Sequence, residues 1–133
     1  MHIIPKIFFI FIICVNGICA EEKIRIKLKV GDEIITNRDI INEKNYLIFL
    51  RPNLGDLSNE EILKISEKSL IREVIKKKEI NKVFKDLDNE KLTNEVKKKL
   101  FIFKKVKNEK EFLKVLSATN LDYKKIIEKM KYE

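Results

Sequence analysis

Apolar and charged residues alternate strictly near the start of the chain. Residues 24–30 read Ile-Arg-Ile-Lys-Leu-Lys-Val, and this period of two is typical of a half-buried β-strand. Gly31-Asp32 separates the segment from a second short run, residues 33–36. Because glycine suits the first central position of a type II′ turn, the pattern predicts a β-hairpin. A two-stranded hairpin alone is only marginally stable in water, so we expect this one to pack against helices.

Helical spacing of the apolar residues begins directly after the hairpin. Thr36 and Asp39 have the spacing of a capping box, with Asp39 in the place that Glu or Gln usually holds. The helix that starts there is expected to run to about Leu50. It ends before Pro52, because the residue that precedes a proline is pushed out of the helical region.

The clearest helix start in the chain is a second capping box, Ser58 with Glu61. This helix is expected to continue to about Phe84, and apolar residues cover much of its circumference, as in a central helix that is packed from several directions. Further start signals predict three shorter helices, which begin after Asp88, Asn108 and Asp122. The pattern therefore predicts a mostly α fold, with an N-terminal β-hairpin followed by about five helices, one of them long and central.

A continuous apolar run, residues 7–15, precedes this region and ends shortly before a small residue, Ala20. This order is that of an export signal, so we predict a signal peptide over residues 1–20, a single domain over residues 21–133 and a periplasmic location. The apolar run is about half as long as the ~20 residues that a spanning helix needs. An uncleaved membrane anchor and lipidation at Cys19 remain the alternatives.

The predicted signal peptide also contains the side chains with the most versatile chemistry. Both cysteines, Cys14 and Cys19, and the only histidine, His2, lie in it. The rest of the chain therefore lacks the usual general base, the thiol nucleophile and the standard zinc ligand sets. We accordingly predict a protein that is not an enzyme, with no catalytic residue, no metal site and no cofactor, held together by packing without disulfides.

The net charge of +8 at pH 7 raises nucleic acid as a partner. The distribution of the charges argues against it, because acidic residues are interleaved almost everywhere. The lysine triplets 76–78 and 97–99 lie on predicted helices, where three consecutive residues fan over roughly 200° and do not form one stripe. We therefore interpret the charge as a solvated helical surface and predict no nucleic-acid partner.

The order of the elements is more informative than any single motif. The hairpin is followed by Asp39-Ile40 at the start of a helix, by Ser69-Leu70-Ile71-Arg72-Glu73 in the long helix and by Asn120-Leu121-Asp122-Tyr123 near the end. This order, over roughly residues 24–130, resembles the N-terminal domain of the SurA-type periplasmic chaperones, which belong with the parvulin-type peptidyl-prolyl isomerases.

The resemblance implies an exported, ATP-independent chaperone domain, a holdase, that binds unfolded outer-membrane proteins or other extended polypeptides. The family's isomerase activity belongs to a parvulin domain that has no counterpart in this sequence, so the resemblance implies no such activity here. Two alternatives stay open. The chain is either a truncated or split subunit, completed by a partner segment or by self-association, or a version tethered to the membrane through an uncleaved signal.

Two sets of residues are candidate contacts for an extended client. The first set is apolar residues that lie off the predicted helix seams: Tyr46, Phe49, Ile71, Ile75 and Phe101. Exposed apolar patches mark interaction surfaces, and the alternative is that these residues pack against other helices. The second set is the apolar face of the predicted first strand, whose edge can accept an extended segment by β-augmentation: Ile24, Ile26, Leu28 and Val30.

Overall fold

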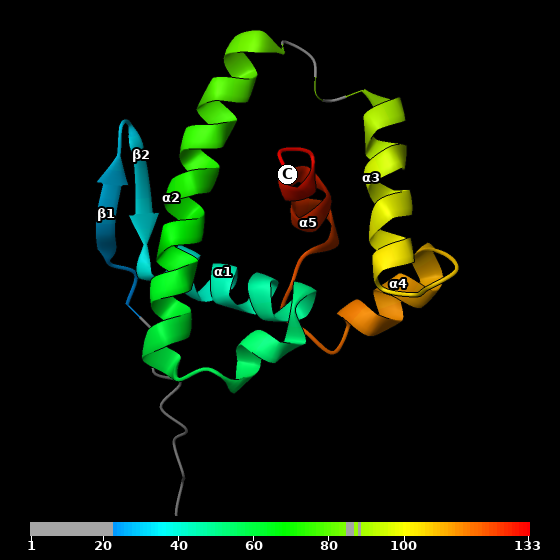
Figure 1. The fold of residues 1–133 in the computed structure, drawn as a ribbon, viewed down its shortest axis with the longest axis horizontal. Coiled ribbons are helices and arrows are strands. Elements are labelled where there is room, and N and C mark those ends of the chain that lie inside the picture. Colours follow the sequence, from blue (N-terminus) through cyan, green and yellow to red (C-terminus); the bar gives the residue numbers. More distant parts are fainter. Residues whose placement is uncertain (1–22, 85–86, 88) are drawn as a thin grey trace, which may run out of the picture.

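The computed structural model describes residues 23–84, 87 and 89–133, and the predicted signal peptide lies outside this part of the chain. The described residues form an antiparallel hairpin and five α-helices (Figure 1). In chain order the elements are β1 (Ile26–Val30), β2 (Glu33–Thr36), α1 (Asn37–Leu50), the short 3-10 helix η1 (Pro52–Asp56), α2 (Asn59–Val83), α3 (Glu90–Phe103), α4 (Glu109–Leu116) and α5 (Tyr123–Met130). The predicted mostly α fold with an N-terminal hairpin is confirmed.

The turn of the hairpin depends on Gly31. Its φ of 61° lies in the left-handed region, whereas Asp32 does not have a positive φ. A positive φ at the first central position alone is the requirement of a type II′ turn, which follows the twist of the flanking strands. The turn predicted from the sequence is therefore the one that the chain adopts.

Both predicted capping boxes are present. The Asp39 N–H donates to the Thr36 hydroxyl at 3.2 Å, and the Thr36 N–H donates to the Asp39 carboxylate at 2.8 Å. Ser58 and Glu61 exchange the same two hydrogen bonds at the start of α2. Each box satisfies donors at a helix end that have no partner inside the helix.

The three shorter helices are capped by single side chains. Asn108 caps α4 and Asp122 caps α5, as the sequence predicts. The cap of α3 is Asn89, whose side chain accepts the Leu92 N–H at 2.7 Å. The sequence pattern predicts this cap one residue earlier, at Asp88, which lies outside the described residues. Both residue types are favourable caps, so the sequence alone did not separate them.

Helix α2 divides the molecule, with the hairpin on one side and α1, α3, α4 and α5 on the other (Figure 1). Its most extensive contact with another helix is with α1, which crosses its N-terminal half. Three isoleucines outside the main core are also buried: Ile35 from β2, Ile40 from α1 and Ile62 from α2. No helix within the described ranges, α2 included, is long and apolar enough to cross a membrane.

The main core lies where α1, α3, α4 and α5 meet, around Phe112. The Phe112 side chain is fully buried. Its ring meets Phe49 edge-on at 6.0 Å between centroids, and it lies 5.6 Å from Phe101 and 5.5 Å from Tyr123. The buried members of this core are Tyr46, Phe49, Val96, Leu100, Phe112, Leu116, Ile126 and Ile127.

Candidate functional site

A β-bulge in the first strand decides which residues the hairpin exposes. Ile26 pairs with Thr36 and Leu28 pairs with Ile35, so Lys27 is an extra residue opposite the partner strand. A shift of one residue moves the following side chains to the other face of a sheet. The alternation is perfect in the sequence, but the bulge interrupts it in the structure.

Because of the bulge, the side chains in the N-terminal half of β1 point to the opposite faces from those that the alternation in its C-terminal half would imply. Arg25 and Lys27 line a cleft beside α2, so Ile24 and Ile26, which alternate with them, point to the outer face of the hairpin. Beyond the bulge the order is reversed, and Val30 lines the cleft on the α2 side. The sequence prediction that the four apolar residues of this strand share one half-buried face is therefore wrong.

The outer face of the hairpin carries three exposed isoleucines. Ile24 is 57% exposed and Ile26 is 67% exposed, whereas Leu28 is half-buried. Ile34 on β2 is 52% exposed, and it points away from its buried neighbour Ile35. The register brings Ile26 and Ile34 into a diagonal cross-strand relationship, within the reach of long side chains. The hairpin therefore exposes three isoleucines in a segment that is otherwise rich in charged residues.

The outer edge of β1 presents backbone groups that β2 does not use. The Arg25 N–H donates to the Asn37 Oδ1 atom at 2.7 Å, and the Asn37 N–H donates to the Arg25 carbonyl at 3.0 Å. Both polar backbone groups of Arg25 therefore point toward β2 and α1. In an extended strand the groups of the adjacent residues, Ile24 and Ile26, point the opposite way. The sheet of the described residues contains only β1 and β2, so this edge is a place where another strand can pair.

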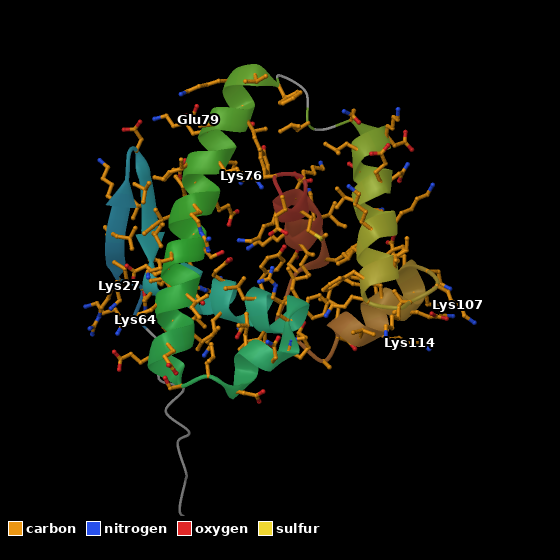
Figure 2. All side chains as sticks on the ribbon, viewed as in Figure 1. Lys27, Lys64, Lys76, Glu79, Lys107 and Lys114 are labelled. Carbon is orange, nitrogen blue, oxygen red and sulfur yellow. The ribbon has the colours of Figure 1, made fainter. Side chains whose placement is uncertain are left out.

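Behind the edge lies a cleft of about 540 Å³ between β1, α1 and α2. Its floor is apolar and includes Ile40, Ile41 and Leu63, while its walls carry four cationic side chains and two carboxylates. The cations are Lys23, Arg25, Lys27 and Lys64, and the carboxylates are Glu60 and Glu67. Lys27 and Lys64 lie near one another at this end of the molecule, far from Lys107 and Lys114 (Figure 2).

The cationic walls are only partly neutralised. Lys64 pairs with Glu60 at 2.7 Å, in an exposed contact between successive turns of α2. Among the salt bridges of the described residues, none involves the side chains of Lys23, Arg25 or Lys27. The cleft therefore combines an apolar floor with an excess of positive charge at its rim.

The five apolar candidates on the helices are not brought together. Tyr46 and Phe49 belong to the buried core, and Phe101 is partly buried against it, so for these residues the alternative interpretation, packing against other helices, holds. Helical spacing predicts that Phe101 is exposed, but in the structure it is Phe103 that is exposed. Ile71 is half-buried and Ile75 is 51% exposed on α2.

A second notable cluster is polar, and the sequence pattern does not predict it. Glu43 on α1 is only 3% exposed, and the ammonium group of Lys129 on α5 contacts both Glu43 and Glu73 on α2. The Lys129 ammonium also lies 4.8 Å from the ring centre of Tyr46. A charged residue on the buried side of a predicted helix was the one available signal for this cluster.

The environment of this cluster shifts two pKa values upward. Burial by itself lowers the pKa of Lys129, but the hydrogen bonds from its ammonium group to Glu43 and Glu73 outweigh burial and raise it. Burial raises the pKa of Tyr46 far above its usual value, and the hydrogen bond from its hydroxyl to Glu133 at 3.0 Å adds to the shift. Both groups are thus held in their protonated forms, which suits a fixed contact between helices.

Comparisons with known proteins identify no relative of this chain. No protein-family model matches it, and searches of curated proteins and of solved structures return no match. The described residues also contain no group of three or more His, Cys, Asp or Glu side chains that could hold a metal ion. The features of the described residues that bear on function are therefore the hairpin, its edge and the cleft beside it.

Proposed function

We propose that this chain is an exported, ATP-independent chaperone domain of the SurA type, which holds unfolded outer-membrane proteins as extended segments. The observation that carries the proposal is the outward edge of β1 at Ile26, where free backbone groups lie beside the exposed Ile24 and Ile26 side chains. A client strand that pairs there gains main-chain hydrogen bonds, which need no particular client sequence.

The fold supports the proposal in a second way. A hairpin followed by five helices, with one long central helix, is the architecture that the resemblance to the SurA-type N-terminal domain implies. In the proposed mechanism, binding uses no ATP, and Asn37 holds the edge of β1 in place before the client arrives. Release follows when the client folds and its strands pair with one another.

An aggregation assay tests this function. An outer-membrane β-barrel protein diluted from urea is expected to stay in solution longer when the purified chain is present at a near-equimolar ratio. Ile26→Ser is expected to weaken this protection severalfold, because the exposed edge loses its apolar contact. Ile102→Ser is the matched control, since Ile102 is an exposed isoleucine on α3. Failure of the folded wild-type chain to delay aggregation, or equal effects of the two substitutions, would contradict the proposal.

A second candidate function, a subunit completed by a partner segment, is favoured by the C-terminal half of α2. Ile75 and Val83 are exposed there, in an otherwise charged segment, and so is Phe84, the C-cap that follows α2. Burial of these side chains by another chain would give α2 the second packed side that its apolar pattern predicts. Sedimentation of the purified chain tests this. A concentration-dependent shift to a dimer supports it, and a monomer at all concentrations argues for a stand-alone domain.

A further inference from the structure

We propose that the segment bound at the β1 edge is one in which apolar residues alternate with acidic residues. The inference rests on the proposed function and deepens it, because it specifies which extended polypeptides the edge prefers. Its basis is the bulge at Lys27, which gives the two faces of the N-terminal half of β1 different chemistry.

A strand added to an edge continues both faces of the strand that it joins. Its side chains would alternate between the outer face, beside Ile24 and Ile26, and the inner face, beside Arg25 and Lys27. The outer positions favour apolar side chains. The inner positions point toward the rim of the cleft, where Arg25, Lys27 and Lys23 lack carboxylate partners among the described salt bridges. Glutamate or aspartate at these positions supplies the partners.

A second copy of this chain fits the same edge poorly. If two β1 strands paired edge to edge, the cationic residues of one copy would lie beside those of the other. Residues 23–30 carry Lys23, Arg25, Lys27 and Lys29 but no acidic residue. Like charges placed directly opposite each other on paired strands are destabilising, so the charge pattern disfavours this dimer.

A membrane surface also fits poorly. The exposed isoleucines lie on the outer face of the hairpin, whereas Arg25 and Lys27 line the cleft on the opposite face. A flat anionic surface would contact one face and leave the other unused. An inserted strand contacts both faces at once, which makes an extended polypeptide the occupant that the geometry favours.

A pair of matched peptides tests the inference. A labelled peptide of alternating valine and glutamate is compared with one of alternating valine and lysine by fluorescence anisotropy at low salt. The wild-type chain is expected to bind the acidic peptide about tenfold more tightly, because several exposed charge pairs act together. The preference should shrink as salt is added, since exposed charges are screened.

Charge reversal at the edge supplies the decisive comparison. R25E/K27E is expected to reverse the preference and bind the lysine peptide more tightly. K107E/K114E removes the same amount of positive charge on the far side of the molecule (Figure 2) and should leave the preference unchanged. If R25E/K27E does not fold, as judged by its circular dichroism melt, R25Q/K27Q replaces it and should abolish the preference.

The possible failures are distinguishable. Equal binding of the two peptides by the wild-type chain, or equal effects of the two charge reversals, would overturn the acidic preference. If the same preparation still delays aggregation of the outer-membrane protein, the proposed chaperone function stands and only the preference is wrong. If the preference is found without any delay of aggregation, the edge binds strands but the chaperone function is wrong.

Discussion

Lys129 on α5 contacts the buried Glu43 on α1 with a distance of 2.5 Å between the Nζ and Oε2 atoms. The same ammonium group contacts Glu73 on α2, so one cation joins three helices. The second carboxylate oxygen of Glu43 is buried and has no hydrogen-bond partner among the described residues. A buried charge of this kind is tolerated only because its counter-ion is close.

Removal of the cation should therefore be costly. Lys129→Met is expected to lower the free energy of unfolding by about 3–5 kcal/mol at pH 7, because it leaves the buried side chain of Glu43 without its counter-ion. Urea unfolding measures the change. In the control, Glu43→Gln/Lys129→Met, the loss should be clearly smaller. A single variant as stable as wild type would show that the contact does not hold the helices together.

Alkaline pH above about 10 should destabilise the fold. The pKa values of Tyr46 and Lys129 are raised, and burial, followed by the hydrogen bond to Glu109, raises the pKa of Tyr123 to about 12. Each group binds its proton more tightly in the folded state. The stability that it contributes is complete below about pH 10, its unfolded value, and is lost as the pH rises through the higher folded value.

Urea midpoints between pH 8 and pH 12 test this pH dependence. The midpoint is expected to fall above about pH 10. Tyr123→Phe should show a shallower fall, because one of the linked protons is no longer present. A midpoint that stays level, or an unchanged slope in Tyr123→Phe, would contradict the assignment.

The aromatic cluster predicts a large difference between two phenylalanines. Phe112→Ala removes a fully buried ring that meets three other rings, and it should cost about 3–5 kcal/mol of stability. Phe103→Ala removes an exposed ring, and the cost should stay within about 0.5 kcal/mol. Thermal melts of the two variants compare them directly. Similar losses would show that the core is not centred on Phe112.

Lys105 offers a stabilising substitution. It follows α3 with a φ of 55°, while the Val106 N–H donates back to the Phe101 carbonyl at 3.0 Å and closes the helix end. Glycine adopts this left-handed conformation without strain. Lys105→Gly is therefore expected to stabilise the chain by about 0.5–1 kcal/mol. Lys107→Gly, a lysine without a positive φ, should bring no gain, and equal effects of the two would contradict the explanation.

Local signals were enough to predict the elements of this fold. Gly31 predicted the hairpin turn, and the Thr36 and Ser58 boxes located the starts of α1 and α2. These signals depend on residues that are close in the sequence, and a single sequence shows such residues directly. Which residues of each helix face the core was harder to predict. Phe101 and Phe103 are two residues apart, and only the position of Phe112 on α4 decides which of them is buried.

The candidate site was only partly predictable, because it depends on contacts between residues that are far apart in the sequence. The sequence identified β1 as a possible edge, but the bulge at Lys27 depends on the pairing with β2 and left no trace in the alternation. Without the bulge, Ile24 and Ile26 would lie on the covered face with Val30. The partnership of Glu43 with Lys129 joins residues 86 positions apart, and helical periodicity carries no information about such distant pairs.

Asn37, which also lines the cleft, should control the edge through its hydrogen bonds to β1. Its side-chain oxygen accepts the Arg25 N–H at 2.7 Å, and its amide nitrogen donates to the Lys23 carbonyl at 3.2 Å. Asn37→Ala removes both hydrogen bonds. The loss of stability should be at most about 0.5–1.5 kcal/mol per hydrogen bond, and it should be confined to the start of β1. Amide hydrogen exchange at Arg25 should accelerate while exchange in α2 stays unchanged, because the opening is local.

The same substitution tests whether the position of the edge matters for binding. If a fixed edge is what a client strand recognises, Asn37→Ala should weaken binding of the valine–glutamate peptide although every side chain of β1 is retained. Asn42→Ala is the control, since Asn42 is exposed on the same helix. Faster exchange at Arg25 with unchanged peptide binding would show that the segment binds elsewhere. Unchanged exchange would show that the backbone bond from the Asn37 N–H to the Arg25 carbonyl is sufficient to hold the strand in place.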